Sequence, residues 1–222
     1  EIERINPFDW EREFAEVFQR GGFDVVIGNP PYVRQESLGR IKVYFKNHYS
    51  VYYGIADLYV YFIERGISLL KDKGIFSYIV ANKWFRANYG RPLRTWLKKQ
   101  NIEEIIDFGD LSVFQKATTY PCIIRISRNP PNARFNFTQV RTLYFVDLIE
   151  YIDENYHTVD QLSLDDKGWS LSDSNTHVLL TKLKNSCIYL EDYVNGKIHR
   201  GIATGLNEAF VIDDKIKDSL IY

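Results

Sequence analysis

Residues 23–32 read FDVVIGNPPY, a β-branched apolar run that ends abruptly in Asn29-Pro30-Pro31-Tyr32. The run predicts a short buried strand. Two prolines cannot continue a strand ladder, so they predict a rigid turn at the carboxyl end of that strand. Functional groups of open α/β sheets gather at the carboxyl ends of strands, which makes this turn the first candidate site.

The turn offers the groups that a planar amine needs. Asn29 supplies a side-chain oxygen, and Pro30, which has no N–H, supplies a carbonyl. Tyr32 supplies an aromatic face on which the ring that carries the amine can stack. Acceptors beside an aromatic plane predict a pocket for an extruded nucleobase. The alternative is a turn that only ends a strand.

The surrounding pattern alternates apolar strands with amphipathic helices. We expect strands over residues 23–28, 75–81, 102–108 and 120–127, and helices over residues 9–20, 56–71 and 92–100. This order is the α/β pattern. No helix separates the last two strands, which predicts an antiparallel hairpin that closes one edge of a mainly parallel sheet.

A boundary is expected at residues 129–132, which read NPPN, because the composition turns acidic after them. The sequence therefore predicts one part over residues 1–130 and a second, α+β part over residues 131–222. In the second part, a helix is expected near residues 174–185 and strands near residues 188–193 and 209–212.

The charge is unevenly distributed along the 222 residues, although the formal net charge is only −1. Residues 81–146 hold 11 Lys and Arg against four Asp and Glu, whereas residues 147–222 hold seven against 14. The stretch 81–101 has no acidic residue and carries Lys83, Arg86, Arg91, Arg94, Lys98 and Lys99. Such a stretch indicates either an ordinary basic surface or a surface for a polyanion.

Residue usage excludes several other classes of protein. Cys122 and Cys187 are too few for a disulfide framework and lack metal-site spacing, and four scattered His do not form a ligand cluster, so no metal is expected. Neither a signal peptide nor an apolar run of about 18 residues is present, which predicts a soluble cytoplasmic protein without a membrane partner. The chain contains no Met, so we expect a piece excised from a longer protein.

The stretch at residues 23–32 resembles motif IV of the N6-adenine DNA methyltransferases. Four further stretches are similar to the gamma class of these enzymes: residues 8–18, 56–62 (ADLYVYF), 81–84 (ANKW) and 201–210 (GIATGLNEAF). This class includes the type II G restriction-modification enzymes, which join methylation and cleavage in one polypeptide, and related phage-defence methyltransferases. The resemblance implies the distal half of a Rossmann-like methyltransferase sheet, followed by the start of an α+β target-recognition domain.

The resemblance also implies the chemistry. S-adenosylmethionine would be the methyl donor, and N6 of an adenine flipped out of double-stranded DNA would be the acceptor. By matching motif positions, the Asn29 side chain and the Pro30 carbonyl would accept from the amine, Pro31 would stiffen the turn, and Tyr32 would stack on the base. Positive charge grows on the nitrogen as it attacks the methyl group, so oriented carbonyl dipoles would stabilise the transition state most.

Two residues outside the turn are further candidates for the catalytic site. The family places an aromatic residue at the position of Phe114, where it would touch the other side of the flipped base; the alternative is a buried loop Phe. Asp57 would lie near the cofactor together with Asn29 and Pro30, and its alternative role is to cap the helix that follows it.

The basic residues would contact DNA. Lys83 and Arg86 follow the carboxyl end of a predicted strand, on the same edge as Asn29. Arg91 and Arg94 lie near the start of the next helix, and all four could meet phosphates. In the second part, the residues expected to reach base edges or phosphates are Arg200, Thr204 and Asn207. The alternative there is a turn-rich structural motif.

The sequence departs from the family on the cofactor side. A glycine-containing loop after a first strand and an acidic residue after a second should precede motif IV, but only 28 residues do so here. We therefore expect the fragment alone to be inactive. Two alternative functions stay open: a protein glutamine methyltransferase, whose Asn-Pro-Pro-Tyr turn grips a side-chain amide, and a non-catalytic DNA-recognition module.

Overall fold

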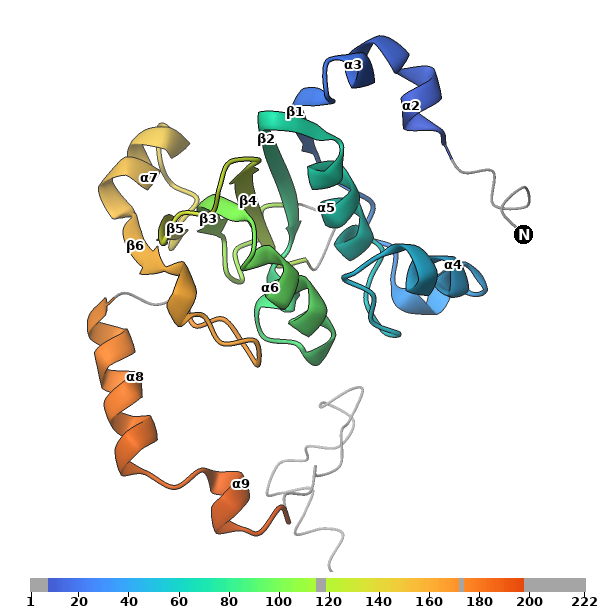
Figure 1. Cartoon of the computed structure of the whole chain (residues 1–222). Helices are drawn as coiled ribbons and strands as arrows, with labels where there is room; N and C mark the ends of the chain where they lie inside the picture. The colour runs from blue at the N-terminus through green and yellow to red at the C-terminus, as the bar shows by residue number, and fades with distance from the viewer. Residues whose placement is uncertain (1–7, 115–118, 172–173, 198–222) are drawn as a thin grey trace, which may run out of the picture. The chain divides into compact units, whose positions relative to one another are not determined.

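The computed structural model describes residues 8–114, 119–171 and 174–197. Its described strands form one mixed sheet in the order β1-β2-β4-β3-β5-β6 (Figure 1). The strands are β1 (Phe23–Gly28), β2 (Leu70–Ala81), β3 (Asn101–Asp107), β4 (Pro121–Ser127), β5 (Arg134–Gln139) and β6 (His157–Asp160). The pairs β1–β2 and β3–β5 are parallel, and the pairs β2–β4, β3–β4 and β5–β6 are antiparallel.

Helices and short 3-10 turns connect the strands. The α-helices are α2 (Trp10–Glu13), α3 (Ala15–Gln19), α4 (Ile41–His48), α5 (Tyr59–Ser68), α6 (Arg91–Leu97), α7 (Leu148–Asn155), α8 (Ser174–Ser186) and α9 (Leu190–Tyr193). The 3-10 turns are η1 (Gln35–Leu38), η2 (Asn82–Phe85), η3 (Asn88–Gly90) and η4 (Gln161–Ser163). Asp9 caps α2 by accepting from the N–H of Arg12.

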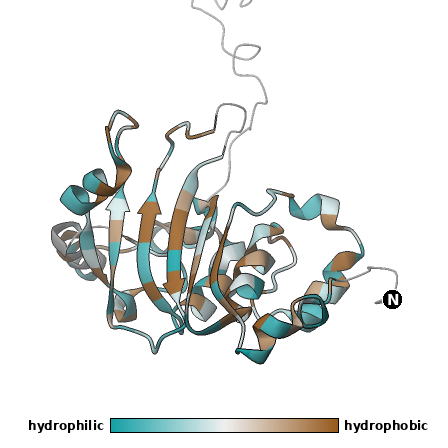
Figure 2. Ribbon diagram, turned by 90° about the horizontal axis from the view of Figure 1, so that it is seen from above, coloured by the Kyte–Doolittle hydropathy of each residue, from teal (hydrophilic) through white to brown (hydrophobic). Residues whose placement is uncertain are grey.

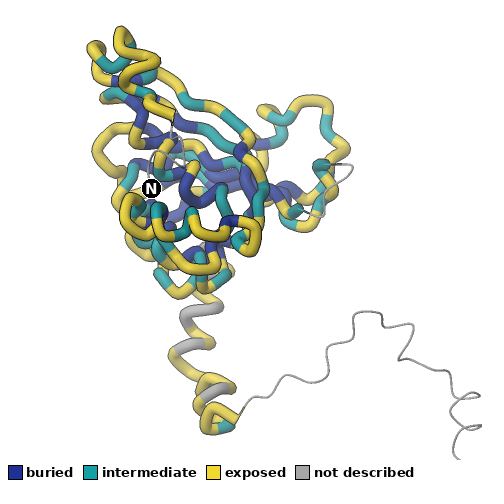
Figure 3. The backbone as a smooth tube through the Cα atoms, turned by 90° about the vertical axis from the view of Figure 1, so that its right-hand side faces the viewer, coloured by how far each residue is buried: buried dark blue, intermediate teal, exposed yellow. Residues whose placement is uncertain are grey.

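The main core lies between one face of the sheet and the helices α5 and α6. It contains Ile63 of α5, Leu97 of α6 and the inward side chains of β2 and β4, such as Phe76 and Ile124. Successive side chains of a strand point to opposite faces. The buried residues accordingly concentrate on the strands and on the inner sides of the two helices (Figure 3).

A smaller core lies on the other face, where α7 packs through Ile152 on Ile106 and Val140. The end of the sheet formed by β1 and β2 has no such cover. Val25 is 56% exposed and Ile27 is 79% exposed. Figure 2 shows apolar residues along the strands, and at this end of the sheet the described residues leave some of those side chains uncovered.

The α/β prediction is confirmed, and the predicted strands and helices are present with shifts at their ends, except that the single helix expected over residues 9–20 is broken at Phe14 into α2 and α3. The predicted hairpin of β3 and β4 is antiparallel, but it does not close the sheet, because β5 and β6 extend it beyond β3. With two parallel and three antiparallel pairs, the sheet is mixed rather than mainly parallel. β5 carries a signal that sequence reasoning missed, since Phe135 and Phe137 alternate with polar residues and are both buried.

The chain divides into two compact units, residues 1–177 and 178–222. The sheet continues past the expected boundary at residue 130 through β5 and β6, and the recognition role of residues 131–222 stays a prediction. The predicted helix near 174–185 is confirmed as α8. The predicted strand near 188–193 is wrong, because α9 occupies residues 190–193, and the strand expected near 209–212 lies outside the described residues. Among the helices that the structure describes, none is long and apolar enough to cross a membrane.

Candidate active site at the carboxyl ends of the strands

The Asn29-Pro30-Pro31-Tyr32 turn follows β1 directly, as the sequence predicts. Its backbone is held close to the sheet at Gly28, where an added Cβ would lie 3.1 Å from a ring carbon of Tyr78. Pro30 is buried, whereas Asn29 is exposed. The turn is therefore anchored by its first proline and leaves the Asn29 side chain accessible at the carboxyl end of the strand.

Hydrogen bonds hold the end of the turn to β2 and the residue after it to the start of α5. The Tyr32 hydroxyl donates to the Ile79 carbonyl at 3.4 Å, and the N–H of Leu58 donates to the Val33 carbonyl at 3.0 Å. Burial raises the pKa of Tyr32 to about 12. The hydroxyl is therefore neutral at physiological pH, and the ring is available as an uncharged stacking surface.

Asp57 holds the same segment from the other side. Its Oδ1 accepts from the N–H of Gln35 at 3.2 Å. The N-terminal cap of α5 is Leu58, without a side-chain hydrogen bond, so the alternative in which Asp57 caps the helix is wrong. Burial raises the pKa of the Asp57 carboxyl above its ordinary value, although the hydrogen bond from the Gln35 N–H and the charge of Lys83 oppose the shift. Asp57 thus joins the segment after the turn to the start of α5, and its cofactor role stays a prediction.

Aromatic rings surround the turn. The Tyr32 ring centroid lies 6.5 Å from that of Phe114 and 6.3 Å from that of Tyr59. The planes of Tyr32 and Phe114 meet at 66°, an edge-to-face contact rather than two parallel plates. Phe114 is half-buried, so it is not a fully buried loop residue. The structure brings together the two rings that the sequence singled out, although they come from loops that follow different strands.

Two polar residues that sequence reasoning missed lie at the same edge. Asn82 follows β2, and Asp107 ends β3. The Asn82 Nδ2 donates to the Asp107 Oδ1 at 2.8 Å, and the N–H of Gly109 donates to the same oxygen at 3.0 Å. Their position after a strand is the signal that identified Asn29, and it could have identified them too.

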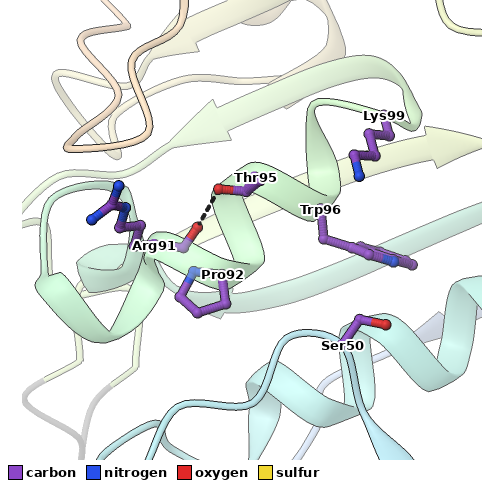
Figure 4. Close-up of a pocket in the computed structure, with 6 residues that line it drawn as sticks. All are labelled: Ser50, Arg91, Pro92, Thr95, Trp96 and Lys99. Carbon is purple, nitrogen blue, oxygen red and sulfur yellow. Dashed lines mark hydrogen bonds between the residues drawn. The ribbon is translucent and has the colours of Figure 1, made fainter.

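Three of the predicted DNA-binding cations are exposed: Lys83, Arg86 and Arg91. Arg91 borders a cavity of about 360 Å³, which is also lined by Ser50, Pro92, Thr95, Trp96 and Lys99 (Figure 4). The Thr95 hydroxyl donates to the Arg91 carbonyl at 3.0 Å. No ion pair involves these three cations within the described ranges, so their charge faces outward.

Arg94 is fully buried, so the expectation that it binds phosphate is wrong. Its guanidinium donates to the carbonyls of Asp166 at 3.0 and 2.8 Å, of Lys167 at 3.1 Å and of Ala87 at 2.8 Å, and it also donates to the Trp84 carbonyl. Arg94 therefore joins the loop after β2 to residues 165–169. The remaining predicted DNA contacts, Arg200, Thr204 and Asn207, lie outside the described residues.

Comparison with known proteins decides the family. Residues 1–114 match the model of the Eco57I restriction-modification methylase family. The chain belongs to this family. The match ends at Phe114 and therefore includes the Asn29 turn, Asp57, Asn82 and Asp107.

Curated relatives of the Eco57I-family chain are methyltransferases of type II systems. The type II methyltransferase M.BstVI of Geobacillus stearothermophilus is 30% identical over 94% of this chain and 40% of its own length. The type II restriction enzyme and methyltransferase RM.Eco57I of Escherichia coli is 28% identical over 100% of this chain and 22% of its own length. The chain thus spans less than half of the length of these relatives.

Solved structures show the same fold at low identity. The type IIG restriction endonuclease BpuSI superposes with a TM-score of 0.53 at 15% identity, over 73% of this chain and 22% of that chain. The methyltransferase subunit of the type I restriction-modification system from Streptococcus thermophilus gives a TM-score of 0.53 at 15% identity, over 73% and 40%. The Eco57I-family chain therefore has a Rossmann-like methyltransferase fold.

The residues around Asn29 fit one side of a methyl-transfer site. Asn29 and Pro30 offer acceptors for an amine. Gly21 and Gly22 precede β1 rather than follow a strand, and a Cβ on Gly22 would lie 2.6 Å from the Leu69 carbonyl oxygen. Gly22 therefore serves close packing against the backbone of residues 69–71, and Gly21 has a φ of +95° in the turn before the strand. Within residues 8–114 and 119–171, no glycine-rich turn follows a strand, so the described Eco57I-family residues do not fit the adenosine part of S-adenosylmethionine.

Proposed function

We propose that this chain carries the acceptor side of the active site of a DNA N6-adenine methyltransferase from a restriction-modification system. The observation that carries the proposal is the Asn29-Pro30 turn at the carboxyl end of β1, with the Tyr32 and Phe114 rings 6.5 Å apart beside it. Membership of the Eco57I family supports the reaction class.

In this proposal the turn orients the amine of a flipped adenine. The Asn29 oxygen and the Pro30 carbonyl accept its two N–H groups and direct the nitrogen lone pair out of the base plane. S-adenosylmethionine supplies the methyl group when it is bound. Because positive charge grows on the nitrogen in the transition state, two fixed carbonyl dipoles stabilise that state more than the ground state.

The exposed cations give the proposed enzyme its hold on DNA. Lys83 and Arg86 belong to the loop that follows β2, and Arg91 begins α6 at the same end of the sheet. Each phosphate that they neutralise would release counterions, so binding should weaken as the salt concentration rises. The stacked base and these phosphates together would hold the target strand.

We further propose that the 222-residue chain alone neither binds S-adenosylmethionine well nor methylates DNA. The support is the close packing around Gly22, which leaves no cradle there for the adenosine. Calorimetry that detects micromolar binding of the cofactor to this chain would contradict the proposal.

The test of the function is Asn29→Ala in the complete protein. We expect methylation of adenine in duplex DNA to fall by at least about 100-fold, the usual cost of losing one such dipole, with DNA affinity within about twofold. Release-factor protein as the alternative acceptor tests the glutamine methyltransferase hypothesis in the same assay.

A matched control is available in the second Asn-Pro-Pro triplet of the chain. Asn129 follows β4, and its Nδ2 donates to the Ser127 hydroxyl at 2.9 Å. Asn129→Ala should leave methylation unchanged. Loss of DNA binding with unaltered methyl transfer in Asn29→Ala would contradict the assigned role.

A further inference from the structure

Asp107 and Asn82 form a polar junction at the sheet edge that carries the Asn29 turn. Asp107 is 8% exposed, and one of its carboxylate oxygens accepts from both Asn82 and Gly109. Its backbone carbonyl accepts from the N–H of Val140 at 2.8 Å and from the Gln139 side chain at 3.1 Å. A single residue thus ties together the ends of β2, β3 and β5.

The junction starts the loop that carries Phe114. Gly109 has a φ of +57°, and a Cβ there would lie 3.1 Å from the Gln139 Nε2. The N–H of Phe108 donates to the Pro121 carbonyl at 3.0 Å, and that of Leu111 donates to the Phe108 carbonyl at 3.0 Å. With the bond from the N–H of Val113 to the Leu111 carbonyl at 2.9 Å, these contacts hold residues 108–113, the stretch directly before Phe114.

Asn82 also has a partner outside β3. The N–H of Asn82 donates to the Tyr120 carbonyl at 2.7 Å, so Asn82 connects β2 with the entry to β4 as well as with Asp107. Ile79, three residues before Asn82, accepts from the Tyr32 hydroxyl. Tyr32 is therefore hydrogen-bonded to β2, whereas Phe114 lies on the loop that follows β3.

We propose that Asp107 and Asn82 are positioning residues, which set the Phe114 ring against Tyr32 and so set the opening into which the base is received. The inference rests on the proposed function. A positioning role differs from a purely stabilising role in one respect. If the role is positioning, removal of the Asn82–Asp107 bond changes base capture only through Phe114.

The test is a double-mutant cycle between Asn82 and Phe114 in the complete protein. The readouts are kcat/KM for duplex DNA and the fluorescence of 2-aminopurine placed at the target adenine. Phe114→Ala should lower kcat/KM by about 5- to 100-fold, the range for one base–aromatic stack. Asn82→Ala should also lower kcat/KM. The kcat/KM of the double variant should lie no more than about twofold below that of Phe114→Ala.

Two further variants separate position from stability. Asn101, at the other end of β3, is also buried and makes two hydrogen bonds, to the Ser127 hydroxyl at 2.8 Å and from the N–H of Asn132 at 2.8 Å. Asn101→Ala should lower Tm as much as Asn82→Ala but leave kcat/KM and the fluorescence within twofold. Asn82→Asp keeps the size of the side chain but sets a second carboxylate against Asp107, and it should lower kcat/KM and change the fluorescence as Asn82→Ala does.

The outcomes are distinct. Effects of Asn82→Ala and Phe114→Ala that multiply in an active enzyme would overturn the positioning role, as would an equal loss of activity in Asn101→Ala. A complete protein that transfers no methyl group to adenine in DNA would instead overturn the proposed function.

Discussion

Tyr32 shows how one residue serves both the fold and the site. Its hydroxyl reaches the Ile79 carbonyl, and its ring lies between those of Tyr59 and Phe114. Tyr59 is itself fixed, since its hydroxyl lies 3.0 Å from that of Tyr89. Tyr32 therefore presents its ring from a rigid support, which lowers the entropy that stacking a base would cost.

We expect Tyr32→Ala to weaken the binding of 2-aminopurine duplex by about 1–3 kcal/mol, the value of one stacked base. Tyr32→Phe should stay within about twofold, because the lost hydrogen bond is long at 3.4 Å. Fluorescence titration of the complete protein measures both. A Phe variant as weak as the Ala variant would show that the hydroxyl, not the ring, carries the interaction.

The raised pKa of Tyr32 sets its pH dependence. The folded value of about 12 lies above the ordinary value of 10.0, so the neutral hydroxyl is the form that the fold favours. Its contribution to stability is complete below pH 10 and is lost as the pH rises toward 12. Base stacking by Tyr32 should accordingly be constant between pH 7 and pH 9.

At the scale of elements, the loop after β2 is fastened by α6. Arg94 reaches from α6 to carbonyls of that loop and of residues 165–169. Trp169 adds two contacts to the same loop. Its backbone N–H donates to the Phe85 carbonyl at 2.8 Å, and its ring meets that of Trp84 edge to face at 5.1 Å. The exposed Lys83 and Arg86 are thus carried by a firmly held loop.

Arg94→Met should lower the free energy of unfolding by about 3 kcal/mol or more, because several carbonyls lose their donors in a buried place. Arg94→Lys should recover only part of this loss, since one ammonium cannot reach both segments. Arg91→Met, at an exposed position of the same helix, should stay within about 0.5 kcal/mol. Chemical denaturation of the complete protein measures all three changes. An equal loss of unfolding free energy in Arg91→Met and Arg94→Met would refute the role of Arg94 in joining the two segments.

Local pattern predicted the elements that carry the Asn29 turn, because a β-branched run followed by Pro-Pro specifies both the strand and its end. It missed the role of Arg94, because the acceptors at Asp166 and Lys167 lie more than 70 residues away in the sequence. Only the tertiary fold distinguishes this arginine from Arg91. The bond between Asn82 and Asp107 was missed for a similar reason, because Asn82 lies in the turn after β2, 25 residues before Asp107 in the sequence.

At the scale of the whole molecule, the described residues leave the sheet face that carries α7 uncovered over β1 and β2. Ile75 of β2, which is 39% exposed, continues the surface formed by Val25 and Ile27 of β1. Sheets with parallel strands are usually covered on both faces. Because the curated relatives are more than twice as long as this chain, we expect another part of the complete protein to cover this face.

Ile27→Lys tests that expectation. In the 222-residue chain it should reduce the binding of an apolar dye, whereas in the complete protein it should lower the free energy of unfolding by about 1.5–3 kcal/mol, the value of one buried aliphatic side chain. Leu162, on η4, is exposed to the same 79%. Leu162→Lys should have no effect in the complete protein, and an equally silent Ile27→Lys would mean that the face stays open.

The strand order has a consequence for biosynthesis. β4 lies between β2 and β3 in the sheet but follows both in the chain. While the polypeptide leaves the ribosome, β2 and β3 therefore have no common neighbour until residue 127 has emerged. The sheet end that carries Asn29, Asn82 and Asp107 is completed only then, and a nascent chain that pauses earlier exposes the unpaired edges of β2 and β3 to chaperones and to other nascent chains.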